Sequence, residues 1–245
     1  MGAVKVVLTD FERTLVRLFE DNEVEREFSK EVRALCAKRG VPKRVLKAAG
    51  TSPYSLWTRA HRWTTKHEDP LAAERMYHAV TRIAIKYEMC AAPSIKLFED
   101  VKPVLEQWKA AGITVMIVSN NDTMAVQRVL RENDAALLVD QVIGRDFDHE
   151  LLGNLKPRPL LLEKALELSG CKPGTALLVG DSVDDMRAGK AAEIGFRVGL
   201  LQHSTVTKWQ LRRAGAKLVL NRFGDLQDHP DLRRRLFGTD VSGVR

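Results

Sequence analysis

Five short apolar runs constrain the fold more than any other feature of the sequence. Each is rich in β-branched residues and lacks the apolar–polar alternation of a half-exposed strand. Continuous apolarity predicts strands of a parallel sheet that is covered on both faces. The runs are residues 4–8, 113–118, 138–143, 175–179 and 196–201, and residues 217–220 are a sixth candidate strand.

Helical patterns separate these runs. Asp100 and Asp122 stand where N-caps would precede apolar stripes, and Pro157 and Pro159 open a further helix. Strands that alternate with helices predict an α/β fold, a doubly wound, Rossmann-like parallel sheet.

One connection is far longer than a crossover between parallel strands requires. A dozen or more residues suffice for a crossover, whereas about a hundred separate residue 8 from residue 113. Apolar residues recur at helical spacing within residues 21–38, and Asp69–Pro70 is a cap and first-turn pair before a second stripe. We therefore predict an α/β core domain of residues 1–15 and 96–245, with an all-helical domain of residues 16–95 inserted in it.

The composition is that of a folded globular protein, with 44% hydrophobic and 29% charged residues. No apolar run approaches the ~20 residues that cross a bilayer. Three scattered cysteines (Cys36, Cys90 and Cys171) predict neither a disulfide framework nor a zinc site. These features favour a cytoplasmic protein without membrane contact.

The formal charge of +7 is spread along the chain, so an anionic substrate is favoured and nucleic-acid binding is not expected. The sequence does not predict the oligomeric state.

Three of the apolar runs end in polar, reactive residues. Asp10 ends the first run, Ser119 and Asn120 end the second, and Asp181 ends the fourth. Ligands of open parallel sheets bind beyond the carboxyl ends of the strands, so these residues are predicted to converge. A single aspartate after a strand is more often a turn or cap residue. The prediction therefore depends on the three ends together.

The order of these residues resembles the haloacid dehalogenase (HAD) superfamily. Residues 6–15, VVLTDFERTL, are similar to its first motif, a strand followed by DxDGT, and IVSN at 117–120 is similar to the second. Lys156 before a proline resembles the third motif, and GDSVDD at 180–185 resembles the fourth, GDSxxD. Members with a helical insert between the first two motifs carry it as a cap over the active site. Residues 16–95 lie between the first two motifs of this chain, so the resemblance implies that they form such a cap.

The resemblance implies a Mg²⁺-dependent phosphomonoester hydrolase that acts on a small phosphorylated metabolite. In such an enzyme the Asp10 carboxylate attacks phosphorus and becomes an aspartyl-phosphate. Lys156 neutralises the developing charge and, with Ser119 and Asn120, binds the phosphate. Magnesium takes hard oxygen ligands. The implied ligands are Asp10, the backbone carbonyl of Glu12, Asp181 and Asp185.

Three residues depart from the family pattern. Glu12 replaces the aspartate that protonates the leaving oxygen and later activates water, and it is one methylene longer. Arg13 and Glu193 replace glycines. Since glycine eases a turn through positive φ, the loop after Asp10 is expected to run differently here. Glu12 either works as acid and base in a phosphatase, or hydrolysis is impaired and the chain is a phosphate-binding regulatory protein. A phosphomutase on the same core is a further alternative.

Substrate specificity is predicted to lie in the insert. Residues 54–63, YSLWTRAHRW, mix aromatic and cationic side chains. Arg59 and Arg62 are candidates for binding a second anionic or planar part of the substrate. The alternative is that Trp57 and Trp63 pack inside the insert while both arginines are solvated. The family does not identify the metabolite.

Overall fold

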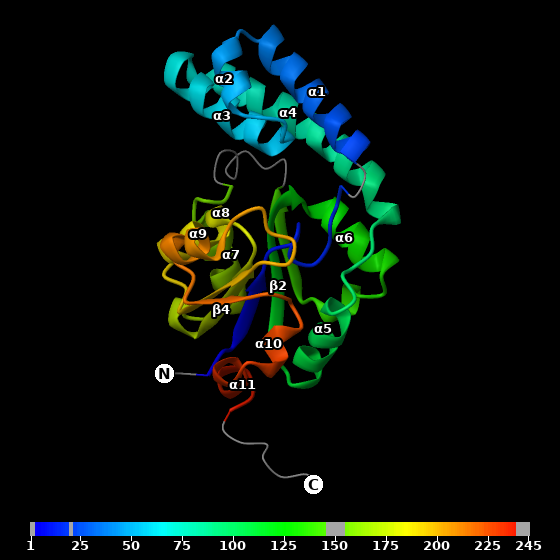
Figure 1. Ribbon diagram of the computed structural model, residues 1–245, viewed down its shortest axis with the longest axis vertical. Helices are drawn as coiled ribbons and strands as arrows, with labels where there is room; N and C mark the ends of the chain where they lie inside the picture. Colours follow the sequence, from blue (N-terminus) through cyan, green and yellow to red (C-terminus); the bar gives the residue numbers. More distant parts are fainter. Residues whose placement is uncertain (1–2, 20–21, 146–154, 239–245) are drawn as a thin grey trace.

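A six-stranded parallel sheet lies at the centre of the part of the chain that the structure, a computed structural model, describes: residues 3–19, 22–145 and 155–238 (Figure 1). The strand order is β3-β2-β1-β4-β5-β6, and every neighbouring pair is parallel. The predicted doubly wound α/β fold is confirmed. The strands are β1 (Val6–Thr9), β2 (Thr114–Asp122), β3 (Gln141–Arg145), β4 (Ala176–Gly180), β5 (Phe196–Leu200) and β6 (Leu218–Leu220).

Helices cover both faces of this sheet, because alternate side chains of the buried strands point to opposite faces. Val7 packs in a cluster with α5, α6, α10 and α11, whereas Val6 and Leu8 pack with α7, α8 and α9. The helices of the first face are α5 (Val101–Ala110), α6 (Thr123–Glu132), α10 (Asp225–Asp228) and α11 (Pro230–Phe237). Those of the second face are α7 (Leu160–Ser169), α8 (Val183–Ala191) and α9 (Lys208–Ala214).

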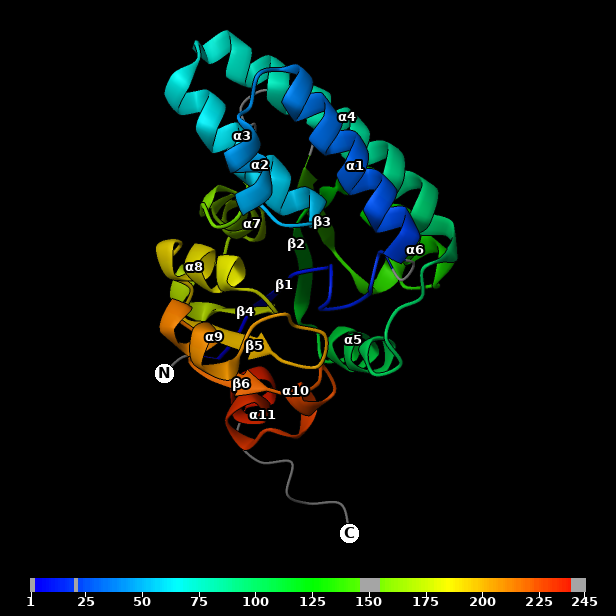
Figure 2. The same ribbon diagram turned by 45° about the horizontal axis from the view of Figure 1, so that its top comes forward.

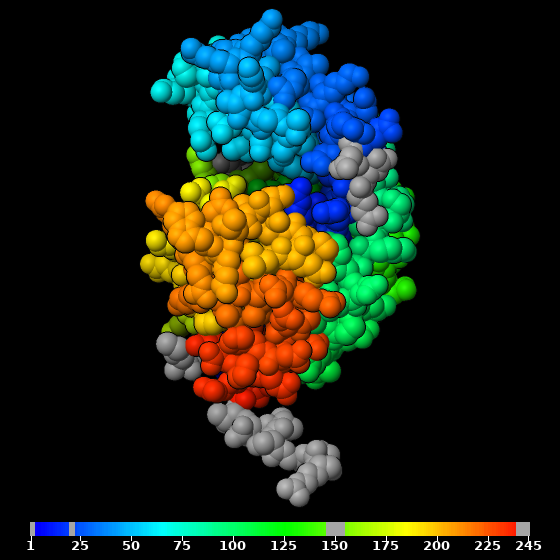
Figure 3. All heavy atoms as spheres, viewed as in Figure 1, coloured from blue at the N-terminus to red at the C-terminus, as the bar shows by residue number. Residues whose placement is uncertain are grey.

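Four further helices lie between β1 and α5: α1 (Asn22–Lys38), α2 (Lys43–Ala48), α3 (Pro53–His67) and α4 (Pro70–Ala91). Asp69 caps α4 as predicted, because its carboxylate accepts a hydrogen bond from the Ala72 N–H at 2.8 Å. This helical group stands over the carboxyl ends of the strands (Figures 1 and 2) and forms a distinct upper lobe in the space-filling view (Figure 3). The exact domain bounds, 16 and 95, stay a prediction.

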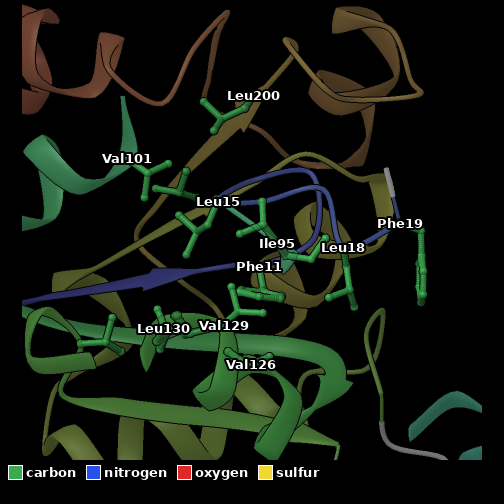
Figure 4. Close-up of a cluster of buried hydrophobic side chains, with 14 of the residues drawn as sticks. Phe11, Leu15, Leu18, Phe19, Ile95, Val101, Val126, Val129, Leu130 and Leu200 are labelled. Carbon is green, nitrogen blue, oxygen red and sulfur yellow. The ribbon is translucent and has the colours of Figure 1, made fainter. Parts of the chain in front are cut away.

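The two connections to the helical group lie side by side. Val16 and Leu97 form an antiparallel bridge, and the Phe98 N–H donates to the Leu15 carbonyl at 2.9 Å. Phe11, Leu15 and Leu18 from the loop after β1 pack against α6 in one buried cluster (Figure 4). The loop that follows Asp10 is therefore fixed by apolar burial.

Two sequence predictions need correction. Residues 138–143 do not form one strand, since Ala136–Leu138 is a 3₁₀ turn and β3 begins only at Gln141. The Asp140 carboxylate accepts from the Val115 N–H at 2.8 Å, a contact that precedes the regular pairing of β2 with β3. Asp100 precedes α5 as expected, but it makes no capping bond. Its carboxylate accepts instead from the distant Gly224 N–H, at 2.9 Å.

No helix in the described ranges combines the length and the apolar character that spanning a membrane requires.

Arg13 and Glu193 both adopt left-handed backbone conformations, with φ of 63° and 56°. The turn after Asp10 therefore keeps the dihedral angle that glycine would favour, contrary to the expectation that the loop changes course at Arg13. A side chain in this region costs roughly 1–2 kcal/mol per residue. At Glu193 the conformation closes the end of α8, where the Ile194 N–H donates to the Gly189 carbonyl at 2.9 Å.

We expect Glu193→Gly to raise the free energy of unfolding by about 0.5–1 kcal/mol, because the relief of strain exceeds the added chain entropy of glycine. Urea unfolding measures this change. Gly170, at φ 62° after α7, is the matched control, since an added Cβ there would meet no atom within 4 Å. Gly170→Ala should lower the same quantity by about 1 kcal/mol. A loss of stability in Glu193→Gly would contradict this account.

Candidate active site

Three buried carboxylates meet at the carboxyl end of the sheet. Asp10 follows β1, Asp181 follows β4, and Asp185 lies in the first turn of α8. One oxygen from each lies within 4.8 Å of the others. The predicted convergence of these strand ends is confirmed. A capping box aims Asp185 at the cluster, because its carboxylate accepts from the Ser182 N–H while the Ser182 hydroxyl accepts from the Asp185 N–H, each at 3.1 Å.

Lys156 is the cation of this cluster. Its buried ammonium lies 2.5 Å from Asp10 Oδ1 and 2.5 Å from Asp185 Oδ1, and it donates to the Val118 carbonyl at 2.9 Å. Burial opposes the charged form, but the two carboxylates outweigh it and raise the pKa of Lys156 above its usual value. The lysine is therefore charged and pairs with both acids.

Asn120 holds the backbone of Lys156. Its side-chain oxygen accepts from the Lys156 N–H at 2.9 Å, and its amide donates to the Lys156 carbonyl at 3.1 Å. The side chain predicted to bind phosphate is thus engaged in placing the lysine. Asn120 also lines the cavity of Asp10, and its direct contact with phosphate stays a prediction.

Ser119 lies at the same cavity as Asp10 and Lys156, a space of about 190 Å³. The serine is buried, and its hydroxyl donates to Asn121 Oδ1 at 2.9 Å and accepts from the Asn121 N–H at 3.1 Å. Ser119 and the end of β2 that follows it line the cavity of Asp10, and phosphate binding by Ser119 stays a prediction.

The charges of the cluster are not balanced, because three carboxylates face one ammonium. Burial and the neighbouring carboxylates raise the pKa of Asp10 to about 6 and that of Asp181 well above its ordinary value. Among the residues described, none donates a hydrogen bond to the Asp181 carboxylate. Excess negative charge on hard oxygen donors fits a Mg²⁺ ion, which Asp10, Asp181 and Asp185 would hold. The carbonyl of Glu12 as a further ligand stays a prediction.

Glu12 lines the same cavity, and its carboxylate accepts from the Leu18 N–H at 2.7 Å. Burial raises the pKa of Glu12 to about 8, although the Leu18 N–H and the nearby Arg13 oppose the shift. The carboxyl group therefore carries a proton near neutral pH. A protonated acid beside Asp10 is what the predicted protonation of a leaving oxygen requires.

A second cavity of about 320 Å³ adjoins the first, since Tyr54, Asn120 and Lys156 line both. Arg62 lines this second cavity, whereas Arg59 is not among the described residues that do. Trp57 is buried and packs against Tyr77 with ring centroids 5.0 Å apart. The helical insert thus contributes an aromatic wall and at least one of the two predicted arginines.

The sequence analysis missed a second buried ion pair, which contacts the end of β2 after Ser119. Arg145 Nη2 lies 2.6 Å from Glu88 Oε2, and both side chains are at most 1% exposed. Glu88 also accepts hydrogen bonds from Tyr54 and Asn121. One signal was present in the sequence, because Glu88 continues the apolar stripe of α4 four residues after the buried Ala84.

Comparison with known proteins agrees with this geometry. A family model of haloacid dehalogenase-like hydrolases matches residues 4–193. The phosphoglycolate phosphatase of Aliivibrio fischeri is 32% identical over 125 residues, 51% of this chain and 53% of that protein. A Haemophilus influenzae phosphoglycolate phosphatase is 29% identical over 193 residues, 77% of this chain and 82% of that protein. The chain spans about half the length of the first curated relatives that it matches.

Solved structures share the fold. A putative haloacid dehalogenase-like hydrolase from Bacteroides fragilis superposes with a TM-score of 0.65 at 21% identity. The match covers 91% of this chain and 99% of that one.

We expect the free energy of unfolding of the metal-free protein to fall as pH rises from about 4.5 to about 8. Over this window Glu12 releases its proton in the unfolded chain but keeps it in the folded protein, so rising pH favours unfolding. In Glu12→Gln the side chain at position 12 cannot titrate, so the free energy of unfolding of this variant should fall less steeply with pH. Urea unfolding in EDTA across this pH range measures both slopes. Glu27→Gln, at an exposed position in α1, should keep the wild-type slope. Parallel curves for wild type and Glu12→Gln would refute the raised pKa.

Proposed function

Because the chain belongs to the haloacid dehalogenase-like hydrolase family, we propose that it is a Mg²⁺-dependent phosphomonoester hydrolase that forms an aspartyl-phosphate on Asp10. The observation that carries this proposal is the buried contact of Lys156 with both Asp10 and Asp185, beside Asp181. Phosphoryl transfer depends mainly on positioning and charge neutralisation. This cluster supplies a carboxylate nucleophile and a fixed cation at one point.

In the first step, an Asp10 oxygen forms a bond to phosphorus while the bond from phosphorus to the ester oxygen breaks. The protonated Glu12 gives its proton to that leaving oxygen, so the alcohol departs neutral. Lys156 stabilises the charge on the phosphoryl oxygens. The Ser119 hydroxyl would add a hydrogen bond to one of them by turning its proton away from Asn121 Oδ1. Bound by Asp10, Asp181 and Asp185, Mg²⁺ would supply further neutralisation of that charge.

In the second step, the Glu12 carboxylate takes a proton from water as the water oxygen attacks phosphorus. The bond from phosphorus to the Asp10 oxygen breaks, and inorganic phosphate and free Asp10 result. The high pKa of Glu12 supports both steps, because it makes the residue an acid near neutral pH and, once ionised, a stronger base than an ordinary carboxylate. This favours a working phosphatase over an impaired, phosphate-binding regulatory protein.

The second cavity favours a substrate whose leaving group carries another negative charge. Arg62, Lys66 and Arg158 all line it, and no acidic residue is among its described lining. Phosphoglycolate, the substrate in the names of the curated relatives, carries a carboxylate of this kind. We therefore propose a small, anionic phosphorylated metabolite as the substrate.

We expect Asp10→Asn to reduce phosphate release on the order of a thousandfold or more, because it removes the nucleophile. Glu12→Gln should give a burst of about one equivalent of nitrophenol from p-nitrophenyl phosphate, followed by slow turnover. That leaving group departs without a proton, whereas the attacking water needs a base. Stopped-flow absorbance measures the burst, EDTA should abolish it, and Mg²⁺ should restore it.

Wild-type turnover in Asp10→Asn would refute the nucleophile. If the wild type releases no phosphate from a panel of phosphorylated metabolites, the regulatory alternative is supported. Transfer of phosphate to a sugar instead of water would identify a phosphomutase.

We expect Arg62→Ala to lower kcat/KM for phosphoglycolate by about tenfold, the effect of losing roughly 1.4 kcal/mol of charge attraction. The same variant should leave p-nitrophenyl phosphate hydrolysis nearly unchanged, because that leaving group carries no carboxylate. Arg59→Ala is the matched control, an exposed arginine one turn away on the same helix, and should affect neither substrate. Equal losses in both variants would contradict a role for the second cavity.

A further inference from the structure

Glu88 and Arg145 form a charge pair in the interior, at the junction of the helical insert and the sheet. Glu88 lies near the end of α4, which contacts both α6 and β2 (Figure 2). Arg145 is the last residue of β3, 57 positions later. Taking two charges out of water is unfavourable, and a well-packed apolar pair is often equally stable. Stability alone therefore does not account for this pair.

The hydrogen bonds of the pair converge on one segment, residues 119–122, the last four residues of β2, where a bulge interrupts the pairing with β3. This bulged segment is called the turn below. Arg145 Nη1 donates to the carbonyl of Asn120 at 2.6 Å. Glu88 Oε2 accepts from the backbone N–H of Asp122 at 3.0 Å, and Glu88 Oε1 accepts from the Asn121 side chain at 3.1 Å. The ion pair thus holds the turn through two backbone groups and one side chain.

The bonds from the ion pair matter because the turn lacks the regular backbone hydrogen bonds of the sheet on the side of β3. Regular pairing of β2 with β3 ends at Val118 and resumes only at Asp122, with a shift of register between them. Ser119, Asn120 and Asn121 lie in that interval, without a regular ladder on the β3 side. They nevertheless line the cavity of Asp10 and, through Asn120, hold Lys156.

We propose that Glu88 and Arg145 are positioning residues that fix the turn of residues 119–122 for phosphate binding, and that this turn thereby depends on the helical insert. The part of this inference that concerns phosphate binding rests on the proposed function, whereas the part that concerns the fixed position of the turn does not. Tyr54 of α3 extends the same contact, because its hydroxyl donates to Glu88 Oε1 at 2.7 Å and accepts from the Asn121 amide at 3.0 Å. Tyr54 also lines both cavities. A group in the second cavity would therefore meet a side chain bonded to the turn.

The test uses two readouts on the whole chain in Glu88→Gln and Arg145→Lys. Amide hydrogen exchange, followed by NMR, measures the fixing of residues 119–122 in the metal-free protein. Calorimetry with Mg²⁺ measures the Kd of inorganic phosphate. We expect exchange at Asp122 to become about tenfold faster in Glu88→Gln, and the phosphate Kd to rise about tenfold in both variants, the equivalent of about 1.4 kcal/mol. Amides of β1 and β4 should keep wild-type exchange.

Thr81→Val is the matched control. Thr81 is fully buried on α4, two turns before Glu88, and no described residue bonds its hydroxyl. This variant changes the buried face of the same helix without changing a contact of the turn, so both readouts should stay at wild-type values.

Tyr54→Phe removes one bond to Glu88 without a change of charge. It is the variant to measure in place of Glu88→Gln or Arg145→Lys if either of these does not fold. It should accelerate exchange at residues 121 and 122 by a smaller factor.

The outcomes separate this inference from the proposed function. Wild-type exchange of the turn in Glu88→Gln and Arg145→Lys, or in Tyr54→Phe if those do not fold, would overturn the inference. Uniform acceleration of all amides, with an unchanged phosphate Kd, would also overturn it, because it shows a purely structural role. A wild-type chain that binds no phosphate, combined with selective acceleration in the turn, would uphold the fixing of the turn and refute only the phosphatase.

Discussion

A single ammonium group between buried carboxylates is the interaction on which the rest of this site depends. Without Lys156, Asp10 and Asp185 would bury negative charge beside Asp181 with no fixed cation described nearby at hydrogen-bonding distance. Removing one partner of a buried pair leaves an uncompensated charge at a cost of several kcal/mol. The surrounding structure holds the lysine accordingly: Asn120 binds its backbone on both sides, and the Val118 carbonyl accepts from its ammonium.

The strand order explains how distant residues reach this lysine. Because β1 lies between β2 and β4, Asp10 is flanked by the end of the strand that carries Ser119 and by the end of the strand that precedes Asp181. The convergence of these strand ends was predictable, since buried parallel strands are continuous apolar runs and their carboxyl ends share one edge. The order of the strands was not predicted. The N-caps Asp69 and Asp122 were also predictable, because a capping bond joins residues that are close in sequence.

Predictions failed where a polar side chain has a partner far away in the sequence. Aspartate is a residue type typical of N-caps, but the Asp100 carboxylate accepts its hydrogen bond from the N–H of Gly224, 124 residues later. The run at 138–143 is apolar enough for a strand, yet Asp140 binds the Val115 N–H before regular pairing begins. Glu88 and Arg145 are the clearest case. A charge within an apolar stripe indicates a buried partner, but nothing in the sequence identifies an arginine 57 residues away.

Arg13 shows how a departure from the family pattern changes a site without changing its backbone. The residue keeps the left-handed dihedral that glycine would favour, so the geometry after Asp10 is retained at the expense of local strain. In return, its guanidinium lies close enough to Glu12 and Asp181 to oppose the rise of the pKa of both. Arg13 also lines the cavity of Asp10, where glycine would contribute no charge. The substitution thus adds a second positive group to a site with an excess of carboxylates. In the proposed phosphatase, a dianionic phosphoryl group approaching Asp10 would meet Arg13 as well as Lys156, and this attraction would compensate for part of the repulsion that the three acids create.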